Sequence, residues 1–409
     1  MPSSIVIGRG LHAPWNEGTR VIARNIGAAV RDAGHESRTI SLSNSATFKA
    51  GDEIPNLVHH IPSRISSRAS LAAISDYCYL LRTARAIRRT EISSESRVYH
   101  LVNLPLALAL FVRKPRQRVV AHVTFSRQIY APAIERMRAE LGWRIFGRWV
   151  DAYACTSEQI RRDLARRGYD PRKLHIVPPP IDLQLFHDAG YSDARRRLGW
   201  DPAAFVVLYI GTVSPLRFPA PDVLEALHLA APDIPGLALK VFAPIATHKY
   251  NTTWADDNVR RAAQGATIPV SVNLEDLTEE RKVLLYSAAD VVLLPFTAPV
   301  AVEPPLTLLE AMACQAAVAV APSANCSNIV SDGVNGVQYD SRLELATCLK
   351  RLFDMGPSGR TALGRAAHAT IDHRYSFEAA ARAIEAMWLA IGLRHDRTID
   401  ADAQSVVTE

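Results

Sequence analysis

The chain has 409 residues and a mass of 44.9 kDa, which is enough for two domains that each bury a hydrophobic core. Hydrophobic residues make up 48% and charged residues 22%, which excludes a disordered chain, and no apolar run reaches the roughly 20 residues of a membrane-spanning helix. The net charge of +6 permits anionic partners, but the arginines are spread along many predicted helices without a nucleic-acid-binding motif. We therefore expect a cytoplasmic protein that does not bind nucleic acid.

The residue types that most often bind metals form no metal-binding pattern. Five cysteines are scattered along the chain without a Cys-x-x-Cys pair, which predicts free, mostly buried thiols in a reducing compartment. The adjacent histidines His59 and His60 have no further ligand nearby, and no acidic pair stands in a metal-binding turn. The sequence predicts no metal site.

The chain begins with a strand, a loop and a helix. Residues 4–8 are apolar, and a helical pattern of apolar side chains follows the loop and ends at Gly34. The glycines at positions 8 and 10 lack the third glycine of a dinucleotide fingerprint at the right spacing, which gives NAD binding little support. The loop between the strand and the helix contains Gly18, which can relieve a tight turn.

Residues 41–75 are polar and serine-rich, and we expect an irregular connection there. Two further strands are predicted over residues 98–102 and 118–123, and each carries a histidine, His100 and His122. A lone histidine is more often structural than catalytic. His122, however, stands where its strand is expected to meet a cleft.

The segment over residues 134–150 carries two tryptophans and several arginines at helical spacing. A basic amphipathic helix can lie on a membrane surface or pack its apolar side in the core, and we favour the core because surface helices of this pattern are common. A strand over residues 151–157 and a strand with a turn over residues 175–182 complete this half. We place a domain boundary near residues 185–200.

A second series of strands and helices starts at residue 205. Residues 205–210 are rich in β-formers and end at Gly211, and the next loop contains Arg217. A permanently charged guanidinium at the carboxyl end of a strand suits a diphosphate, although arginines are also common on surfaces. Further strands are predicted over residues 237–242 and 268–272, and a helix over residues 277–289.

Residues 290–336 contain the most informative pattern. A short strand over Val291–Leu294 stops at Pro295, and a helix then begins at a proline pair, with Leu306, Leu309 and Met312 at the spacing of a buried stripe. A second strand and the turns Asp-Gly and Asn-Gly follow. A helix that begins at the carboxyl edge of a parallel sheet favours a phosphate at its amino terminus.

Two carboxylates lie on this segment. Glu303 precedes the helix and Glu310 stands within it, so both can face a ligand at the helix start. Acidic residues also suit a helix amino terminus without any ligand, and the carboxylates alone leave both interpretations open.

The order of an aspartate, a strand, a proline, a glutamate, Leu-Glu-Ala-Met-Ala-Cys, a valine-rich strand and Asp-Gly-x-Asn-Gly resembles the donor-site signature of retaining family 4 glycosyltransferases. The resemblance covers nearly the whole chain and implies the GT-B fold, two Rossmann-like α/β domains that face each other across a cleft. An acceptor-side domain would span residues 1–190 and a nucleotide-sugar-binding domain residues 200–375. A helix over about residues 378–393 would pack back on the first domain, and we expect a disordered tail over residues 395–409.

The resemblance also implies roles for single residues. Glu310 would hold the ribose of the nucleotide, and Glu303 would contact the donor sugar, with six residues between them where the family has seven. His122 would line the sugar site, and Arg217 would hold the diphosphate. The remaining donor-site residues would be Gly18, Gly211, Leu306 and Thr307, with Asn16 and Thr19 in a loop that closes over the phosphates and the acceptor.

The implied reaction moves a sugar from a UDP- or GDP-sugar to an acceptor hydroxyl with retention at the anomeric carbon, without a metal ion or cofactor. The acceptor would be a sugar, a lipid-linked molecule or a small molecule, and contact with a membrane surface stays open. Two alternatives also stay open: a nucleotide-sugar epimerase of the same fold, and a non-catalytic protein that binds a sugar nucleotide or a partner protein. Thr212, where the family has an arginine, and the Pro304-Pro305 pair, which lacks amide donors, keep the non-catalytic alternative open.

Overall fold

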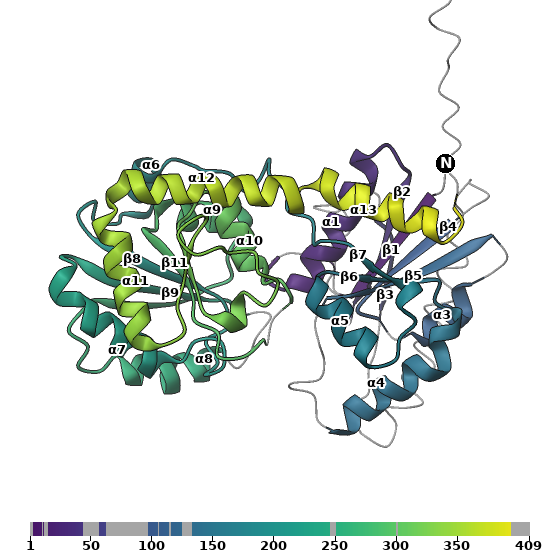
Figure 1. Cartoon of the computed structure of the whole chain (residues 1–409), viewed down its shortest axis with the longest axis horizontal. Helices are drawn as coiled ribbons and strands as arrows, with labels where there is room; N and C mark the ends of the chain where they lie inside the picture. Colours follow the sequence, from purple (N-terminus) through teal and green to yellow (C-terminus); the bar gives the residue numbers. More distant parts are fainter. Residues whose placement is uncertain are drawn as a thin grey trace, which may run out of the picture.

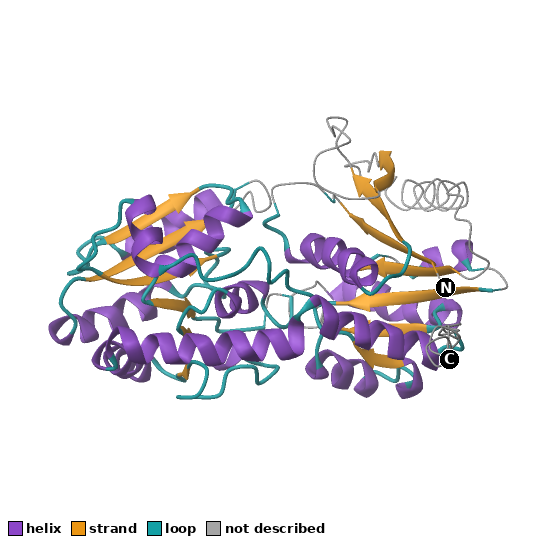
Figure 2. Cartoon of the chain, turned by 90° about the horizontal axis from the view of Figure 1, so that it is seen from above, coloured by secondary structure: helices purple, strands orange, loops and turns teal. Residues whose placement is uncertain are grey.

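A computed structural model of the chain describes residues 3–9, 11, 15–43, 57–62, 97–104, 106–113, 116–124, 133–245, 251–299 and 302–393. These residues form two α/β domains that lie side by side (Figures 1 and 2). Each domain is built on a parallel sheet with helices packed against it, which confirms the predicted fold class.

The first domain contains a seven-stranded sheet in the order β3-β2-β1-β4-β5-β6-β7. Its strands are β1 (Ser3–Arg9), β2 (Ser37–Ser43), β3 (Leu57–Pro62), β4 (Arg97–Val102), β5 (Gln117–Val123), β6 (Ala152–Cys155) and β7 (Leu174–Ile176). Its helices are α1 (Gly18–Asp32), α3 (Ala107–Val112), α4 (Ala133–Phe146) and α5 (Glu158–Arg166).

The sheet of the first domain corrects one sequence prediction. We expected an irregular connection over residues 41–75, but β2 extends to Ser43, and β3 contains His59 and His60. Among the strands that the structure describes, β3 lies at the edge of the sheet and pairs in parallel with β2. The prediction was wrong because this pairing across the sheet is not visible in a short, polar stretch of sequence. Residues 44–56 and 63–75 lie outside the described ranges.

The second domain contains a six-stranded sheet in the order β10-β9-β8-β11-β12-β13. Its strands are β8 (Phe205–Ile210), β9 (Leu237–Ala243), β10 (Val270–Leu274), β11 (Val291–Leu294), β12 (Val318–Val320) and β13 (Val337–Gln338). Its helices are α6 (Tyr191–Leu198), α7 (Ala220–Ala230), α8 (Asn251–Trp254), α9 (Glu279–Ala288), α10 (Leu306–Ala313), α11 (Arg342–Asp354) and α12 (Gly356–Tyr375).

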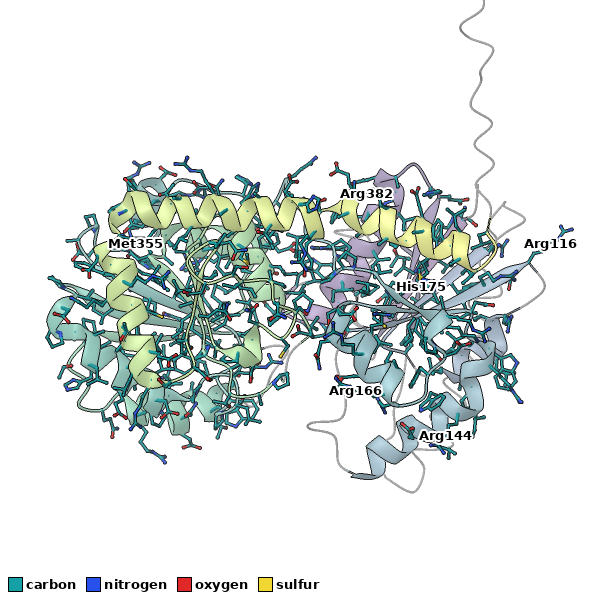
Figure 3. All side chains as sticks on the ribbon, in the orientation of Figure 1. Arg116, Arg144, Arg166, His175, Met355 and Arg382 are labelled. Carbon is teal, nitrogen blue, oxygen red and sulfur yellow. The ribbon has the colours of Figure 1, made fainter. Side chains whose placement is uncertain are left out.

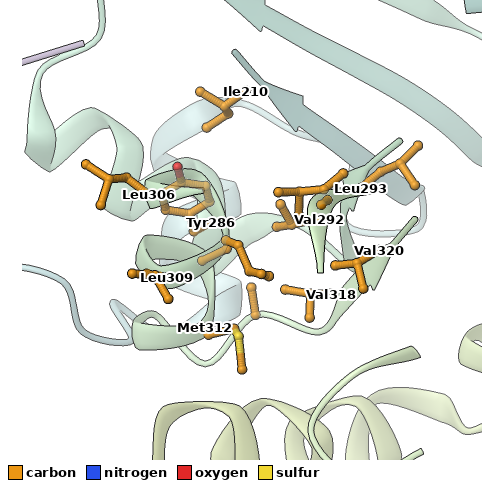
Figure 4. Close-up of a cluster of buried hydrophobic side chains, with 14 of the residues drawn as sticks. Ile210, Tyr286, Val292, Leu293, Leu306, Leu309, Met312, Val318 and Val320 are labelled. Carbon is orange, nitrogen blue, oxygen red and sulfur yellow. The ribbon is translucent and has the colours of Figure 1, made fainter. Parts of the chain in front are cut away.

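The central strands of the second sheet are buried on both faces, which explains their continuous apolar sequence. Helix α10 is also buried around most of its circumference, because it packs between the sheet and helix α12. Figure 4 shows Leu306, Leu309 and Met312 of this helix in a cluster with Val292 and Val318 from the strands. The predicted stripe is therefore part of a wider apolar surface that holds α10 at the sheet edge.

Asp290 anchors the start of β11. Its buried carboxylate accepts hydrogen bonds from Arg195 at 2.5 Å, Arg360 at 2.9 Å and the amide of Val206 at 2.8 Å. The two arginines come from helices α6 and α12, so a single carboxylate joins both helices to the sheet.

The chain returns to the first domain at its carboxyl end. Helix α12 runs along the second domain, and α13 (Phe377–Ala390) continues across onto the first, where it packs against α1 (Figure 1). The side chain of Trp388 is buried there, and its indole nitrogen donates to His100 at 3.3 Å.

The surface carries many of the arginines. Figure 3 shows Arg116 and Arg144 pointing outward from the first domain, and the Arg144 side chain is 66% exposed. Of the helices that the structure describes, none combines the length and the apolar character that a membrane span requires. Among the described cysteines, all are free thiols: Cys155, Cys314 and Cys348 are buried, and Cys326 is half-buried.

Candidate functional site

A cavity of about 150 Å³ lies where the two domains meet. The first domain contributes the loop that leads into α1, and the second contributes the end of β8, the loop after it and helices α9 and α10. The structure brings most of the predicted site residues to this cavity, namely Asn16, Gly18, Gly211, Arg217, Leu306, Thr307 and Glu310. Their roles in binding or catalysis stay predictions.

Gly18 lies at the first position of α1 and faces the second domain. A β-carbon added at this glycine would lie 2.9 Å from a methyl group of Val302 and 3.4 Å from Leu306. Its φ angle is not in the left-handed region. The structure therefore favours a close approach between the domains over a tight turn as the reason for glycine.

Arg217 places a half-buried guanidinium in the loop after the carboxyl end of β8. Its Nη1 donates to the hydroxyl of Thr212 at 3.3 Å. Burial lowers the pKa of Arg217, but an arginine remains protonated at physiological pH. The side chain is thus a fixed positive charge beside the cavity, as a diphosphate would require.

Glu310 is the buried carboxylate of the cavity, with 3% of its surface exposed. Tyr286 donates to one carboxylate oxygen at 3.0 Å, and the ammonium of Lys282 lies 3.4 Å from the other. Burial raises the pKa of Glu310, whereas the charge of Lys282 and the hydrogen bond from Tyr286 act in the opposite direction. Both partners are on α9, so this helix holds the carboxylate of Glu310, which belongs to α10, beside the cavity.

Sequence reasoning missed Lys282 and Tyr286. The sequence predicts a helix over residues 277–289 and gives neither residue a role at the site, yet Lys282 is only 6% exposed. Its ammonium also donates to the backbone carbonyl of Trp15 in the first domain at 3.0 Å. The available signal was the spacing of Lys282 and Tyr286, which are four positions apart and therefore share one helix face.

Glu303 lies at the domain interface but is not among the residues that line the cavity. Its amide donates to the carbonyl of Thr124 at 2.9 Å, and its carbonyl accepts from the hydroxyl of Thr156 at 2.5 Å. Its carboxyl accepts a hydrogen bond from Ser327, and burial raises its pKa to about 7. Two residues of the first domain thus hold the backbone of this loop.

The structure does not bring His122 to the cavity. Its ring lies in the interior of the first domain, with Nε2 2.7 Å from Nδ1 of His100. Burial lowers the pKa of both histidines, that of His100 to about 3, so both rings are neutral. Thr124, two residues further along the chain, contacts Glu303, because β5 ends at Val123 and the loop begins there.

Thr19 is likewise outside the cavity lining. Its amide and its hydroxyl both donate to the side chain of Glu17, which caps α1. Asn16 does line the cavity, and its amide nitrogen is buried without a hydrogen-bond partner among the described residues. The ranges that the structure describes contain no group of three potential metal ligands.

Two family models match the chain. The one described as Glycosyltransferase Family 4 covers residues 17–185, and the one described as Glycosyl transferase-like covers residues 223–386. A D-inositol 3-phosphate glycosyltransferase of Geodermatophilus obscurus is 33% identical over 199 residues, which cover 46% of this chain and 42% of the relative. The chain spans about half the length of the curated relatives that it matches.

Solved structures share the fold. HepE of Anabaena in complex with UDP has a TM-score of 0.70 and 15% identity, covering 95% of this chain and 100% of that chain. A sucrose-phosphate synthase of Thermosynechococcus elongatus has a TM-score of 0.73 and 16% identity, covering 95% and 98%. With the two matched halves, these likenesses confirm the GT-B architecture.

Proposed function

Because the chain belongs to the family 4 glycosyltransferases, we propose that it transfers a sugar from a nucleoside diphosphate sugar to an acceptor hydroxyl with retention at the anomeric carbon. The observation that carries the proposal is Glu310, a buried carboxylate held by two donors beside the cavity between the domains. An ionised carboxylate has about four acceptor positions. Tyr286 and Lys282 occupy one on each oxygen, which leaves one on each oxygen for the two hydroxyls of a ribose.

The diphosphate would lie between Arg217 and the amino terminus of α10. Leu306 and Thr307 are the first residues of that helix and line the cavity, so their amides and the helix dipole favour an anion. As the bond between the anomeric carbon and the diphosphate breaks, negative charge grows on the diphosphate oxygen. A fixed guanidinium stabilises that charge without reorganisation, which makes the nucleotide a better leaving group.

Glu303 would contact the donor sugar from the domain interface. Its backbone is held by Thr124 and Thr156 of the first domain, so it lies where donor and acceptor domains meet. The arrangement needs no metal ion, because Arg217 and the start of α10 supply the positive potential. His122, buried against His100, takes no part in the proposed chemistry.

The names of similar proteins suggest the first donor and the first acceptor to test. HepE has been crystallised with UDP and with UDP-glucose, so a uridine donor is the first to test. Several relatives are named D-inositol 3-phosphate glycosyltransferases, so a polyol phosphate is the first acceptor. The new glycosidic bond would join the acceptor oxygen to the anomeric carbon as the bond to the diphosphate breaks, and the acceptor's hydroxyl proton would pass to the departing diphosphate oxygen.

Calorimetric titration with UDP, GDP, dTDP and NAD tests the donor site. We expect one diphosphate to bind and Glu310→Ala to weaken its binding by about 100-fold, because the ribose loses its acceptor in a buried site. Glu280→Ala is the matched control, since this glutamate is exposed on α9. Binding of none of the diphosphates, or of NAD alone, would overturn the proposal.

Turnover separates the proposal from its alternatives. The enzyme is supplied with an acceptor and with a sugar derivative of the nucleoside diphosphate that binds. We expect a glycoside whose anomeric configuration, read by NMR, matches that of the donor. Release of nucleotide with an epimerised free sugar and no use of acceptor would indicate an epimerase. Tight binding without turnover across acceptor classes would indicate a non-catalytic protein.

A further inference from the structure

One face of α9 links the proposed nucleotide site to the first domain. Glu279, Lys282 and Tyr286 are spaced i, i+3 and i+7, so they lie along the same side of the helix. Glu279 receives two hydrogen bonds from Arg24 of α1, at 2.6 and 2.7 Å. Tyr286 donates a hydrogen bond to Glu310. Lys282 contacts both Glu310 and the Trp15 carbonyl.

Lys282 is therefore the one member of this face that touches the two sides of the cavity together. Its ammonium lies 3.4 Å from Glu310 and 3.0 Å from the carbonyl of Trp15, and its side chain is 7% exposed. Burial of an ammonium is unfavourable unless it is paired, and an uncharged side chain of similar length would fill the space without that cost. Core packing alone does not account for a lysine here.

The Trp15 carbonyl belongs to the loop that forms the first-domain wall of the cavity. The ring of Trp15 is itself buried and packs under the guanidinium of Arg24, 4.5 Å from its carbon to the ring centroid. Arg24 in turn holds Glu279. The loop, α1 and α9 thus each contact the other two, and Lys282 of α9 also contacts the carboxylate of Glu310.

We propose that Lys282 is a positioning residue that holds Glu310 as an acceptor for the ribose hydroxyls and ties it to the Trp15 loop, so that nucleotide binding and domain contact are linked. The inference rests on the proposed nucleotide site. A nucleotide bound to Glu310 favours the position of this carboxylate beside Lys282. The hydrogen bond from Lys282 to the Trp15 carbonyl in turn keeps the ammonium beside Glu310.

The charges around Glu310 determine how pH enters. Lys282 favours the ionised carboxylate, Glu279 on the same helix opposes it, and Tyr286 donates to it. Cys314, which also faces this carboxylate, stays a neutral thiol because burial raises its pKa. Removal of the ammonium therefore raises the pKa of Glu310 further. As the pH falls, the carboxylate becomes protonated earlier, so nucleotide binding is lost at a higher pH than in the wild type.

The experiment compares Lys282→Met, Lys282→Arg and Glu279→Gln in the full chain. UDP binding is measured by calorimetry between pH 5 and 8, and the radius of gyration by small-angle scattering with and without saturating UDP. We expect Lys282→Met to weaken UDP about tenfold at pH 7, to shift the loss of binding to higher pH, and to reduce the compaction caused by UDP. Lys282→Arg keeps the charge, so its pH profile of UDP binding should match that of the wild type. Glu279→Gln should weaken the contact between the domains. It should not move the loss of UDP binding to higher pH, because it removes a group that opposes ionisation of Glu310.

A double-mutant comparison then tests whether Lys282 acts through Glu310. We expect Lys282→Met to have no further effect on UDP binding once Glu310→Gln is present, because the two residues act as one unit. Additive effects, or wild-type binding and compaction in Lys282→Met, would overturn this inference. Absence of UDP, GDP and dTDP binding in the wild type would instead overturn the proposed function itself, so the two failures are distinguishable.

Discussion

Glu303 is a carboxyl group whose ionisation the fold alters. Burial raises its pKa to about 7, so the folded protein binds a proton that the unfolded chain has released. The resulting stabilisation is fully present below the ordinary pKa of a glutamate and is lost as the pH rises through 7. For a shift from about 4.5 to about 7, the loss is about 3 kcal/mol.

Glu303→Gln removes this pH dependence, because glutamine is neutral throughout. We expect the free energy of unfolding of the variant to gain about 2 to 3 kcal/mol relative to the wild type between pH 5 and 8. Urea unfolding at several pH values measures the difference. Glu158→Gln is the control: arginines lower the pKa of Glu158 to about 2, so its contribution changes only below pH 5. A difference that stays constant across this range would show that Glu303 is already ionised in the folded protein between pH 5 and 8, which would contradict the raised pKa.

Single residues also show what the sequence could and could not predict. Glu310 was predictable because its surrounding motif is local and specific. Lys282 was not, because a charged residue on an amphipathic helix normally faces solvent, and its burial depends on Trp15, 267 positions away. His122 was placed on the correct strand, yet a shift of two positions separates it from Thr124, the residue at the domain interface.

Among the elements, helices α9 and α10 and the central strands of the second domain were predicted because each carries its own periodicity. Strands β8 and β11 were predicted with the bounds that the structure shows, since short apolar runs that end in glycine or proline are typical of buried parallel strands. The edge strand β3 was missed, because its pairing with β2 is the only feature that defines it and lies outside the segment.

Helix α13 offers a test at the level of an element. Trp388 is 2% exposed and its indole nitrogen donates to His100, so it anchors the helix on the first domain. We expect Trp388→Ala to lower the free energy of unfolding by about 3 to 5 kcal/mol, because it leaves a cavity and removes the donor to Nε2 of His100. The neighbouring Leu389→Ala should cost little, since that side chain is 58% exposed. Denaturant unfolding of both variants measures this, and equal losses would contradict the anchoring role.

The arrangement of the whole molecule could be predicted only through the resemblance to a known fold. Nothing in the composition or periodicity of the chain relates α1 to α9, because the contacts between them join residues 255 positions apart. The structure supplies these contacts as a set of charged and backbone groups around the cavity. Their strength determines how readily the two domains separate to exchange ligands.

The Arg24 and Glu279 pair provides the test at this scale. Their side chains are 14% and 10% exposed and form a bidentate contact between the domains. Arg24→Glu places two carboxylates together, and we expect it to lower the free energy of unfolding by about 2 kcal/mol and to increase the radius of gyration in small-angle scattering. Adding Glu279→Arg should restore most of both values, because the exchanged pair has opposite charges again. The same exchange at Arg161 and Glu158, a more exposed pair within one helix, should leave the radius of gyration unchanged, since it joins no domains. If the double variant stayed as expanded as Arg24→Glu, the contact would depend on side-chain shape at each position, and attraction between charges would not be what holds the domains together.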